Sequence, residues 1–244
     1  MKLFLVLPHF GYPIYIYRNC KLKTLLFSYF DYAPTSLEYL ENDHPEALLD
    51  SGAFSMMTNP KKLQPIESYT NNYAEFINEH KIDKFFELDL DSIIGYDKVK
   101  KIRSDLEDKT GKQVIPVWHR SRGKNDFIRM CKKYSQVAIG GFVVKTIAKT
   151  EYNFMKWFTK TAHCCDAKIH GLGLNPEHGQ RLGFDSVDVS SWTAPLRFGG
   201  AYYKFDGERM AKITCGRRLV NHLELVEHQL NEWCKYQNYL EKLA

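Results

Sequence analysis

Acidic residues recur at the ends of apolar, strand-like segments of this sequence. They are Asp50 after Ala-Leu-Leu, Asp89 and Asp91 around the end of Phe-Phe-Glu-Leu-Asp-Leu, and Asp188 in Ser-Val-Asp-Val. If these segments are parallel strands, their carboxyl ends meet at one edge and the carboxylates face one cavity. Unpaired buried carboxylates are destabilising or lose their charge, so stability alone does not explain such a group.

Paired carboxylates suit chemistry at C1′ of a sugar. One carboxylate attacks the anomeric carbon and forms a covalent glycosyl-enzyme, and another carries a proton to the leaving group and from the incoming group. When a nucleobase both leaves and arrives, the result is base exchange. The acidic residues therefore indicate a site of this chemical type.

Other polar or small residues follow strand-like segments in the same way. Ser51 follows Asp50, His119 and Arg120 follow residues 114–118, and Gly140–Gly141 end residues 137–142. Each also has a purely structural interpretation: an aspartate that caps a turn or a helix, a core histidine, or glycines that permit a tight strand exit. Their shared position at strand ends favours a functional site over these separate explanations.

The segments that must position these residues alternate between strand-like and helical patterns. The strand-like runs after the N-terminal one are residues 25–30, 47–50, 85–90, 114–118, 137–142, 167–172, 186–189 and 211–214. Between them, Ile66, Tyr69, Tyr73 and Phe76 repeat with helical period, and residues 216–242 predict a long C-terminal helix. Alternating strands and helices favour a parallel sheet with right-handed crossovers.

Eight such units predict an α/β fold of the (β/α)8 TIM-barrel type, with residues 1–244 as a single domain. The N-terminal run of residues 1–7 is expected to be an extra strand at an edge, and the helix over 216–242 is expected to follow the barrel. An open doubly wound sheet is the main rival, but no Gly-x-Gly-x-x-Gly motif follows the first strand.

The composition allows a nucleic-acid partner without requiring one. The net charge is +5, hydrophobic residues make up 44% and aromatic residues 14% of the chain. No apolar run reaches the length of a membrane span, and the N-terminus lacks the pattern of a signal peptide, so no membrane partner is expected. Six cysteines without a Cys-x-x-Cys pair suggest a reduced, cytoplasmic protein.

Four ordered motifs resemble those of the tRNA-guanine transglycosylases. They are Asp50-Ser51-Gly52-Ala53-Phe54-Ser55, Ala138-Ile139-Gly140-Gly141-Phe142, Gly171-Leu172-Gly173-Leu174-Asn175-Pro176-Glu177 and Gly183-Phe184-Asp185-Ser186-Val187-Asp188. The similarity is closer to the shortened DpdA branch, phage and bacterial enzymes that insert 7-deazaguanine bases into DNA. The phrase Val187-Asp188-Val189-Ser190-Ser191-Trp192-Thr193, followed by Arg197-Phe198-Gly199, resembles that branch.

The resemblance implies a role for each matched residue. Asp188 would be the nucleophile and Asp50 the general acid/base. Asp91, or Asp89 if the alignment slips, would bind the purine N–H groups. Further substrate contacts are implied for Ser51, Phe54 (stacking on the base), His119 (where the family has a glutamine), Gly140, Gly141 and Trp192.

The resemblance also bears on metal and nucleic acid. The tRNA enzymes carry a Cys-x-Cys-x-x-Cys zinc site with a distant His, whereas this chain has Cys215 with His222 and His228, so neither a metal nor a cofactor is expected. In the family, the subdomain that holds this zinc helps to position tRNA, so the resemblance without it favours DNA over tRNA as the substrate. Candidate contacts to the DNA backbone are Arg120, Arg122, Lys124, Arg197, Arg217 and Arg218.

These observations predict a transglycosylase that replaces guanine in DNA with a 7-deazaguanine such as 7-cyano-7-deazaguanine, in the host cytoplasm if the enzyme is phage-encoded. Three alternatives stay open at this point. The first is base exchange on tRNA, the second a non-catalytic nucleic-acid-binding barrel that serves as a subunit, and the third retaining glycoside hydrolysis, which uses the same carboxylate chemistry.

Overall fold

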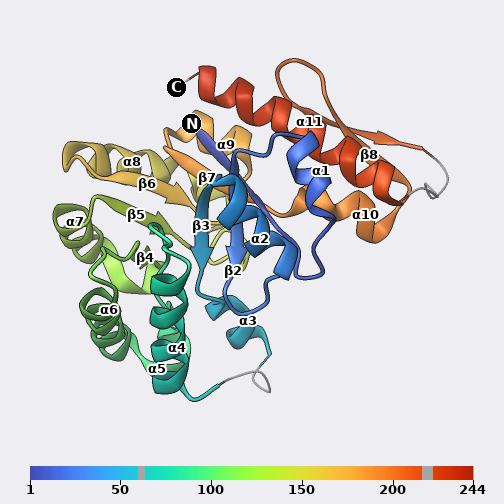
Figure 1. Cartoon of the computed structure of the whole chain (residues 1–244). Helices are drawn as coiled ribbons and strands as arrows, with labels where there is room; N and C mark the ends of the chain where they lie inside the picture. The colour runs from blue at the N-terminus through green and yellow to red at the C-terminus, as the bar shows by residue number, and fades with distance from the viewer. Residues whose placement is uncertain (60–63, 216–221, 244) are drawn as a thin grey trace.

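The central sheet of the computed structural model, which describes residues 1–59, 64–215 and 222–243, has seven parallel strands. In sheet order they are β3 (Glu46–Asp50), β2 (Thr24–Ser28), β1 (Lys2–Val6), β7 (Ser186–Val189), β6 (Lys168–Gly171), β5 (Gln136–Ile139) and β4 (Val117–Trp118). The sheet curls into a half-barrel, and helices lie along its outer face (Figure 1). The predicted α/β class with parallel strands is confirmed.

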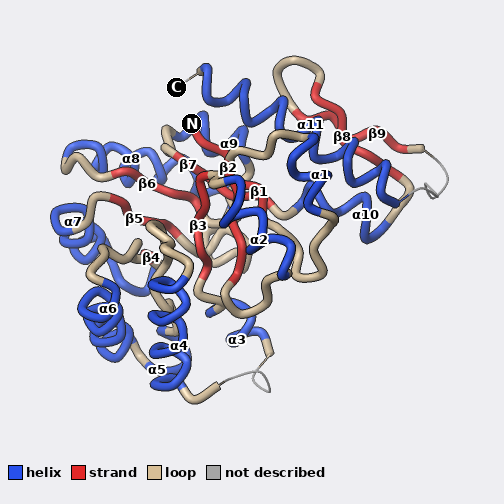
Figure 2. Tube along the Cα trace, viewed as in Figure 1, coloured by secondary structure: helices blue, strands red, loops and turns tan. Residues whose placement is uncertain are grey.

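Helices occupy most of the connections between successive strands (Figure 2). They are α1 (Ile14–Asn19), α2 (Pro34–Asp43), α3 (Ala53–Thr58), α4 (Ile66–Glu79), α5 (Asp91–Ile94), α6 (Tyr96–Thr110), α7 (Gly123–Lys133), α8 (Met155–Cys164), α9 (Pro176–Leu182), α10 (Ala194–Phe198) and α11 (His222–Lys242), with short 3-10 turns η2 (Arg120–Arg122), η3 (Lys149–Phe154) and η4 (Ser191–Thr193). The predicted apolar face of α4 is confirmed, because Tyr69, Tyr73 and Phe76 are buried.

Backbone bridges connect the two outermost strands of the sheet. Leu49 of β3 pairs in parallel with Phe85, and Phe86 pairs in parallel with Ile115, just before β4. The Phe86 N–H donates to the Leu49 carbonyl at 3.0 Å, and the Ile115 N–H donates to the Phe85 carbonyl at 2.9 Å. Residues 85 and 86 therefore lie between β3 and β4, where the sequence predicts a longer strand over 85–90.

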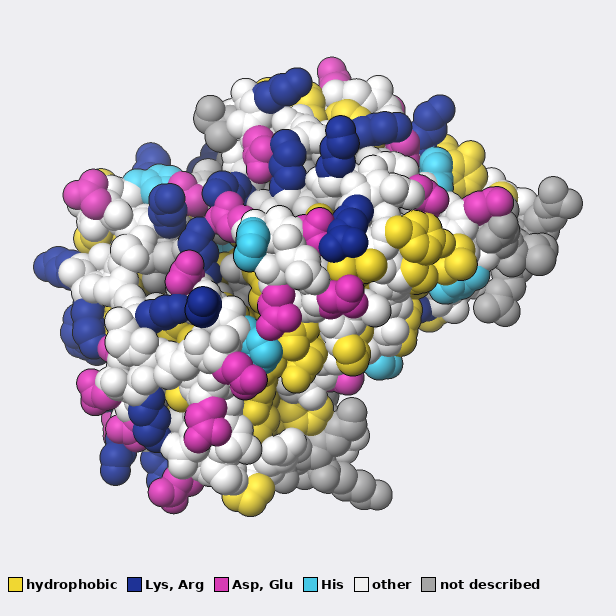
Figure 3. Space-filling view, viewed as in Figure 1, with side chains coloured by type: hydrophobic (Ala, Val, Ile, Leu, Met, Phe, Trp, Pro, Cys, Tyr) yellow, Lys and Arg dark blue, Asp and Glu magenta, His cyan; other side chains and the backbone are white. Residues whose placement is uncertain are grey.

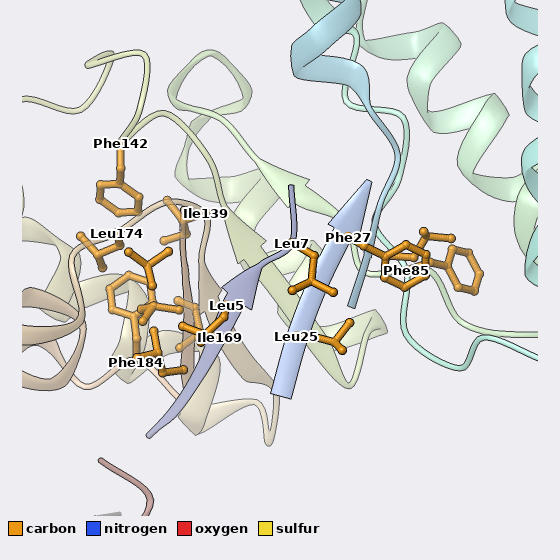
Figure 4. Close-up of a cluster of buried hydrophobic side chains, with 14 of the residues drawn as sticks. Leu5, Leu7, Leu25, Phe27, Phe85, Ile139, Phe142, Ile169, Leu174 and Phe184 are labelled. Atoms are coloured by element: carbon orange, nitrogen blue, oxygen red, sulfur yellow. The ribbon is translucent and has the colours of Figure 1, made fainter. Parts of the chain in front are cut away.

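Both faces of the curled sheet are buried. Side chains of successive strand residues point to opposite faces, so each strand contributes residues to both. The inner face carries one cluster, formed by Phe4, Leu26, Leu48, Phe86, Ile115, Val117 and Ala138. The outer face packs against the helices through alternate residues such as Leu5, Leu25, Phe27 and Ile169 (Figure 4). The interior of the half-barrel is therefore filled by apolar side chains. Polar residues follow at the carboxyl ends of the strands.

Two predicted strands take other places than expected. The N-terminal strand β1 was expected at an edge, but it lies between β2 and β7, because Leu3 and Leu5 on one face and Phe4 on the other are all buried. Residues 211–214 were counted with the barrel, but β9 (Met210–Thr214) pairs with β8 (Ala201–Phe205) in a separate antiparallel hairpin.

The predicted long C-terminal helix is confirmed as α11, whose expected beginning at residue 216 lies outside the described residues. Its buried side includes Val226, Leu230 and Trp233. Gln237 of α11 donates hydrogen bonds to the carbonyls of Leu3 (2.8 Å) and Thr24 (2.9 Å). The helix therefore covers the amino ends of β1 and β2 (Figure 1), and its Leu240 carbonyl accepts a hydrogen bond from the Met1 amino group at 3.0 Å.

Candidate active site

Three carboxylates from separate segments gather at the carboxyl end of the sheet. Asp50 is the last residue of β3, Asp188 lies in β7 opposite Phe4 of β1, and Asp89 follows the segment that bridges β3 and β4. Asp50 lies two residues beyond the inner-face residue Leu48, so its side chain points to the same interior. The sequence-based expectation that these carboxylates share one region agrees with this arrangement.

The Asp50 carboxyl has a proton affinity suited to general acid/base chemistry. Burial, together with the nearby negative charges of Asp89 and Asp188, raises the pKa of Asp50 to about 7. The Gly52 backbone N–H, 3.1 Å from Oδ2, opposes the shift by stabilising the anion. A carboxyl that gains and loses its proton near neutral pH can act first as an acid and then as a base.

The loop after β3 holds Asp50 in place. Gly52 has a φ of 79°, and a Cβ at this position would lie 2.2 Å from the Phe30 Cβ, so only glycine fits. The Tyr69 hydroxyl of α4 donates a hydrogen bond to the Ser51 carbonyl at 2.7 Å. Ser51 itself is fully buried, a position that does not fit the substrate contact expected of its side chain.

Asp188 is held through one of its two carboxylate oxygens. Its Oδ1 accepts a hydrogen bond from the Gly173 N–H at 2.7 Å and lies 3.1 Å from Nε2 of His170. Among the described residues, no hydrogen bond is made to Oδ2, and the side chain is 11% exposed. A carboxylate anchored by one oxygen and open at the other suits a positioned nucleophile.

His170 is a residue that the sequence analysis missed. It lies in β6 at the register position opposite Ser186 of β7, and its side chain is fully buried. A signal was present, because His170 directly precedes the glycine-rich turn of the third motif and stands inside an apolar strand. Without the pairing of β6 with β7, its contact with Asp188 could not be inferred.

Asp89 forms a pair with His119. The His119 Nε2 lies 2.7 Å from Asp89 Oδ2, and the two side chains are 23% and 14% exposed. Gly140 makes room for this pair, because a Cβ there would lie 2.6 Å from the His119 Cε1. Gly141 has a φ of 100°, which a residue with a side chain rarely adopts. The glycines therefore position His119 and shape the turn after β5.

A pocket of about 720 Å³ lies beside the carboxylates. Its lining includes the predicted residues Phe54, Asp89, Asp91, His119 and Arg120, with Met57, Thr58, Ser92, Ser121, Val144 and Thr146. Phe54 is 46% exposed and therefore available to stack on a ring. Of the three carboxylates, Asp89 lines this pocket, whereas Asp50 and Asp188 do not.

Arg122 does not fit the expectation of a contact with nucleic acid. Its side chain is only 1% exposed, and its guanidinium binds Glu87 at 2.6 Å and Asp91 at 2.7 Å. The Tyr96 ring covers it, with the ring centroid 4.2 Å from Cζ. Arg122 therefore fixes the Asp91 carboxylate at the pocket wall, and it is unavailable to a DNA backbone.

Trp192 also occupies the interior rather than a ligand surface. Its side chain is fully buried, and its indole N–H donates to the Val6 carbonyl at 2.8 Å. This bond ties the turn after β7 to the end of β1. The expected substrate contact of Trp192 does not fit this position, and the residue instead supports the strand that carries Asp188.

The remaining predicted cationic contacts differ in their surroundings. Arg120 is exposed and pairs with Glu151 at 2.7 Å, and Lys124 lies over the Trp157 ring. Arg197 is exposed and lies 5.3 Å from the Phe198 ring centroid. Arg217 and Arg218 lie outside the described residues. On the face drawn in Figure 3, basic and acidic side chains are interspersed.

Within residues 1–59, 64–215 and 222–243, no group of three or more His, Cys, Asp or Glu side chains is arranged to hold a metal ion. The described helices include none whose length and apolar character would allow it to cross a bilayer.

Comparison with known proteins adds no relative. No protein-family model matches the chain, and a search of curated proteins finds no match to its sequence.

Proposed function

We propose that this chain is a base-exchange transglycosylase that replaces guanine in DNA with a 7-deazaguanine such as 7-cyano-7-deazaguanine. One observation carries the proposal. Asp188 is anchored by Oδ1 in a region that also holds Asp50, whose pKa of about 7 suits proton transfer. Two carboxylates with such different environments divide naturally into a nucleophile and an acid/base.

The proposed reaction has two displacements at C1′ of the target deoxyribose. Asp188 attacks C1′ while the C1′–N9 bond breaks, and the departing guanine takes the electron pair of that bond and a proton from Asp50. The incoming 7-deazaguanine then gives its N9 proton to the Asp50 carboxylate. Its N9 forms the new bond to C1′ as the bond from C1′ to Asp188 breaks, which restores both side chains.

The pocket beside the carboxylates is the proposed base site. Phe54 would stack on the ring, and Asp91 or Asp89 would accept hydrogen bonds from the purine N–H groups. Arg122 supports this role, because two of its N–H groups donate to Asp91 Oδ2 and orient that carboxylate. The turn at Gly140 and Gly141 would offer backbone groups to the base carbonyl.

We also propose that the half-barrel is part of a closed (β/α)8 barrel. The first and last strands, β1 and β7, are neighbours, as in a cyclic strand order and unlike a doubly wound sheet. The bridges Leu49–Phe85 and Phe86–Ile115 support closure, because they connect β3 with the strand segment before β4. In this proposal residues 85–86 take the place of the fourth strand.

A DNA partner would meet the rim formed by the loops after the strands. The exposed cations Arg120, Lys124 and Arg197 are the proposed backbone contacts among the described residues. The target guanine would leave the base stack to reach Asp188. The proposed place of action is the cytoplasm, which in an infected cell is that of the host.

Labelled 7-deazaguanine distinguishes the candidate substrates. The protein is incubated with labelled base and either guanine-containing DNA or bulk tRNA, and we expect label in DNA. Label that enters only tRNA would overturn the choice of DNA. In a second assay, denaturing gels should show a covalent protein–DNA adduct that Asp188→Asn abolishes. An adduct that survives in Asp188→Asn and is lost in Asp50→Asn would reverse the two roles.

A further inference from the structure

We propose that His170 is a positioning residue that orients the Asp188 carboxylate for attack on C1′. This inference rests on the proposed function. The imidazole forms the middle of a buried chain that runs from the Ser186 hydroxyl to Asp188. Nδ1 lies 2.9 Å from Ser186 Oγ, and Nε2 lies 3.1 Å from Asp188 Oδ1.

The fold leaves His170 little freedom to turn. It lies on the inner face of β6, and its side chain is fully buried. The Phe4 ring lies 6.1 Å from it in an edge arrangement, and the Phe86 ring lies 5.4 Å from it. These rings come from β1 and from the segment between β3 and β4. The imidazole plane is therefore fixed by packing from strands other than its own.

The contacts place a proton on Nε2 of His170. If Nε2 carried a lone pair, it would face a carboxylate oxygen and the two would repel. Nε2 must therefore carry a proton, which it donates to Asp188 Oδ1. The Ser186 hydroxyl can donate to Nδ1, and among the described residues Ser186 Oγ makes no other side-chain hydrogen bond. An imidazole with a proton on Nε2 satisfies both partners.

This arrangement explains how Asp188 is oriented. The Gly173 N–H and the His170 Nε2–H both donate to Oδ1, so the carboxylate cannot rotate without breaking two hydrogen bonds. Oδ2 is then the oxygen directed away from these donors and free to attack. Partners that orient a reacting side chain in this way commonly change activity about 10–100-fold when they are removed.

Two substitutions at one position test the orienting hydrogen bond. His170→Gln keeps an amide N–H near the position of Nε2, and His170→Met fills similar volume without a donor. In single-turnover reactions with a guanine-rich oligodeoxynucleotide, we expect His170→Met to slow adduct formation about 10–100-fold. His170→Gln should recover most of the rate, and both variants should bind the oligonucleotide as the wild type does. Equal rates for His170→Met and wild type would overturn the proposal.

A measurement on the unsubstituted protein covers the case in which the variants fail to fold. Nitrogen-15 NMR of the imidazole should show a ring protonated at Nε2, and Ser186→Ala should alter the Nδ1 signal. A ring protonated only at Nδ1 would overturn the proposal. If the wild type forms no adduct with DNA, the proposed function fails, whereas the NMR result still decides whether His170 donates to Asp188.

Discussion

Asp50→Asn should stabilise this protein at neutral pH while it abolishes base exchange. The pKa of Asp50 rises from an ordinary value of 3.8 to about 7, mainly because the carboxyl is buried. The folded state therefore holds the proton more tightly than the unfolded chain does. As the pH rises from about 4 to 7, the folded state must accept a buried charge, and its stability falls.

The size of the effect follows from linkage. Each pH unit in this interval removes about 1.4 kcal/mol of unfolding free energy. Between pH 5 and pH 8 the wild type should lose about 2.5 kcal/mol through Asp50, because the loss levels off above pH 7. Asparagine is almost isosteric and can still accept the hydrogen bond from the Gly52 N–H, but it never ionises. The variant should therefore lack this part of the pH dependence.

Urea denaturation at pH 5 and pH 8 measures the difference. The free energy of unfolding of Asp50→Asn, relative to wild type, should rise by about 2.5 kcal/mol between the two pH values. Asp108→Asn, on the exposed side of α6, is the control and should show no such rise. A difference between Asp50→Asn and wild type that is the same at both pH values would refute the argument from burial and neighbouring charge.

The other predictions concern the surroundings of the carboxylates. Arg122→Met should lower the unfolding free energy by about 3–5 kcal/mol in denaturation, because Asp91 loses its ion pair and the buried Glu87 keeps only one of its two arginine partners, Arg103. Arg120→Met, at an exposed ion pair, should change it by less than about 1 kcal/mol. Phe54→Ala should weaken binding of the incoming base by about 1–3 kcal/mol in calorimetric titration, without loss of stability. Gly140→Ala should reduce base exchange about 10-fold, because its Cβ would displace His119; an unchanged rate would show that the position of His119 does not matter.

Several features followed from local sequence pattern. Asp50 and Asp188 end or lie within short apolar runs, and parallel strands bring such positions to one edge whatever lies between them. The helical period of Tyr69, Tyr73 and Phe76 predicted α4 because burial of one helix face depends on spacing alone. Phe54, which the resemblance implies would stack on a base, lines the pocket because the short α3 begins immediately after the β3 turn.

Other features depended on contacts between distant parts of the chain, which spacing does not encode. The N-terminal strand is central only because β2 and β7 both pair with it, and Arg122 is buried because Glu87 and Asp91 meet it from another connection. The sequence by itself determined which residues reach that edge of the sheet. Tertiary structure decided their states: it raises the pKa of Asp50 by burial and places His170 against Asp188.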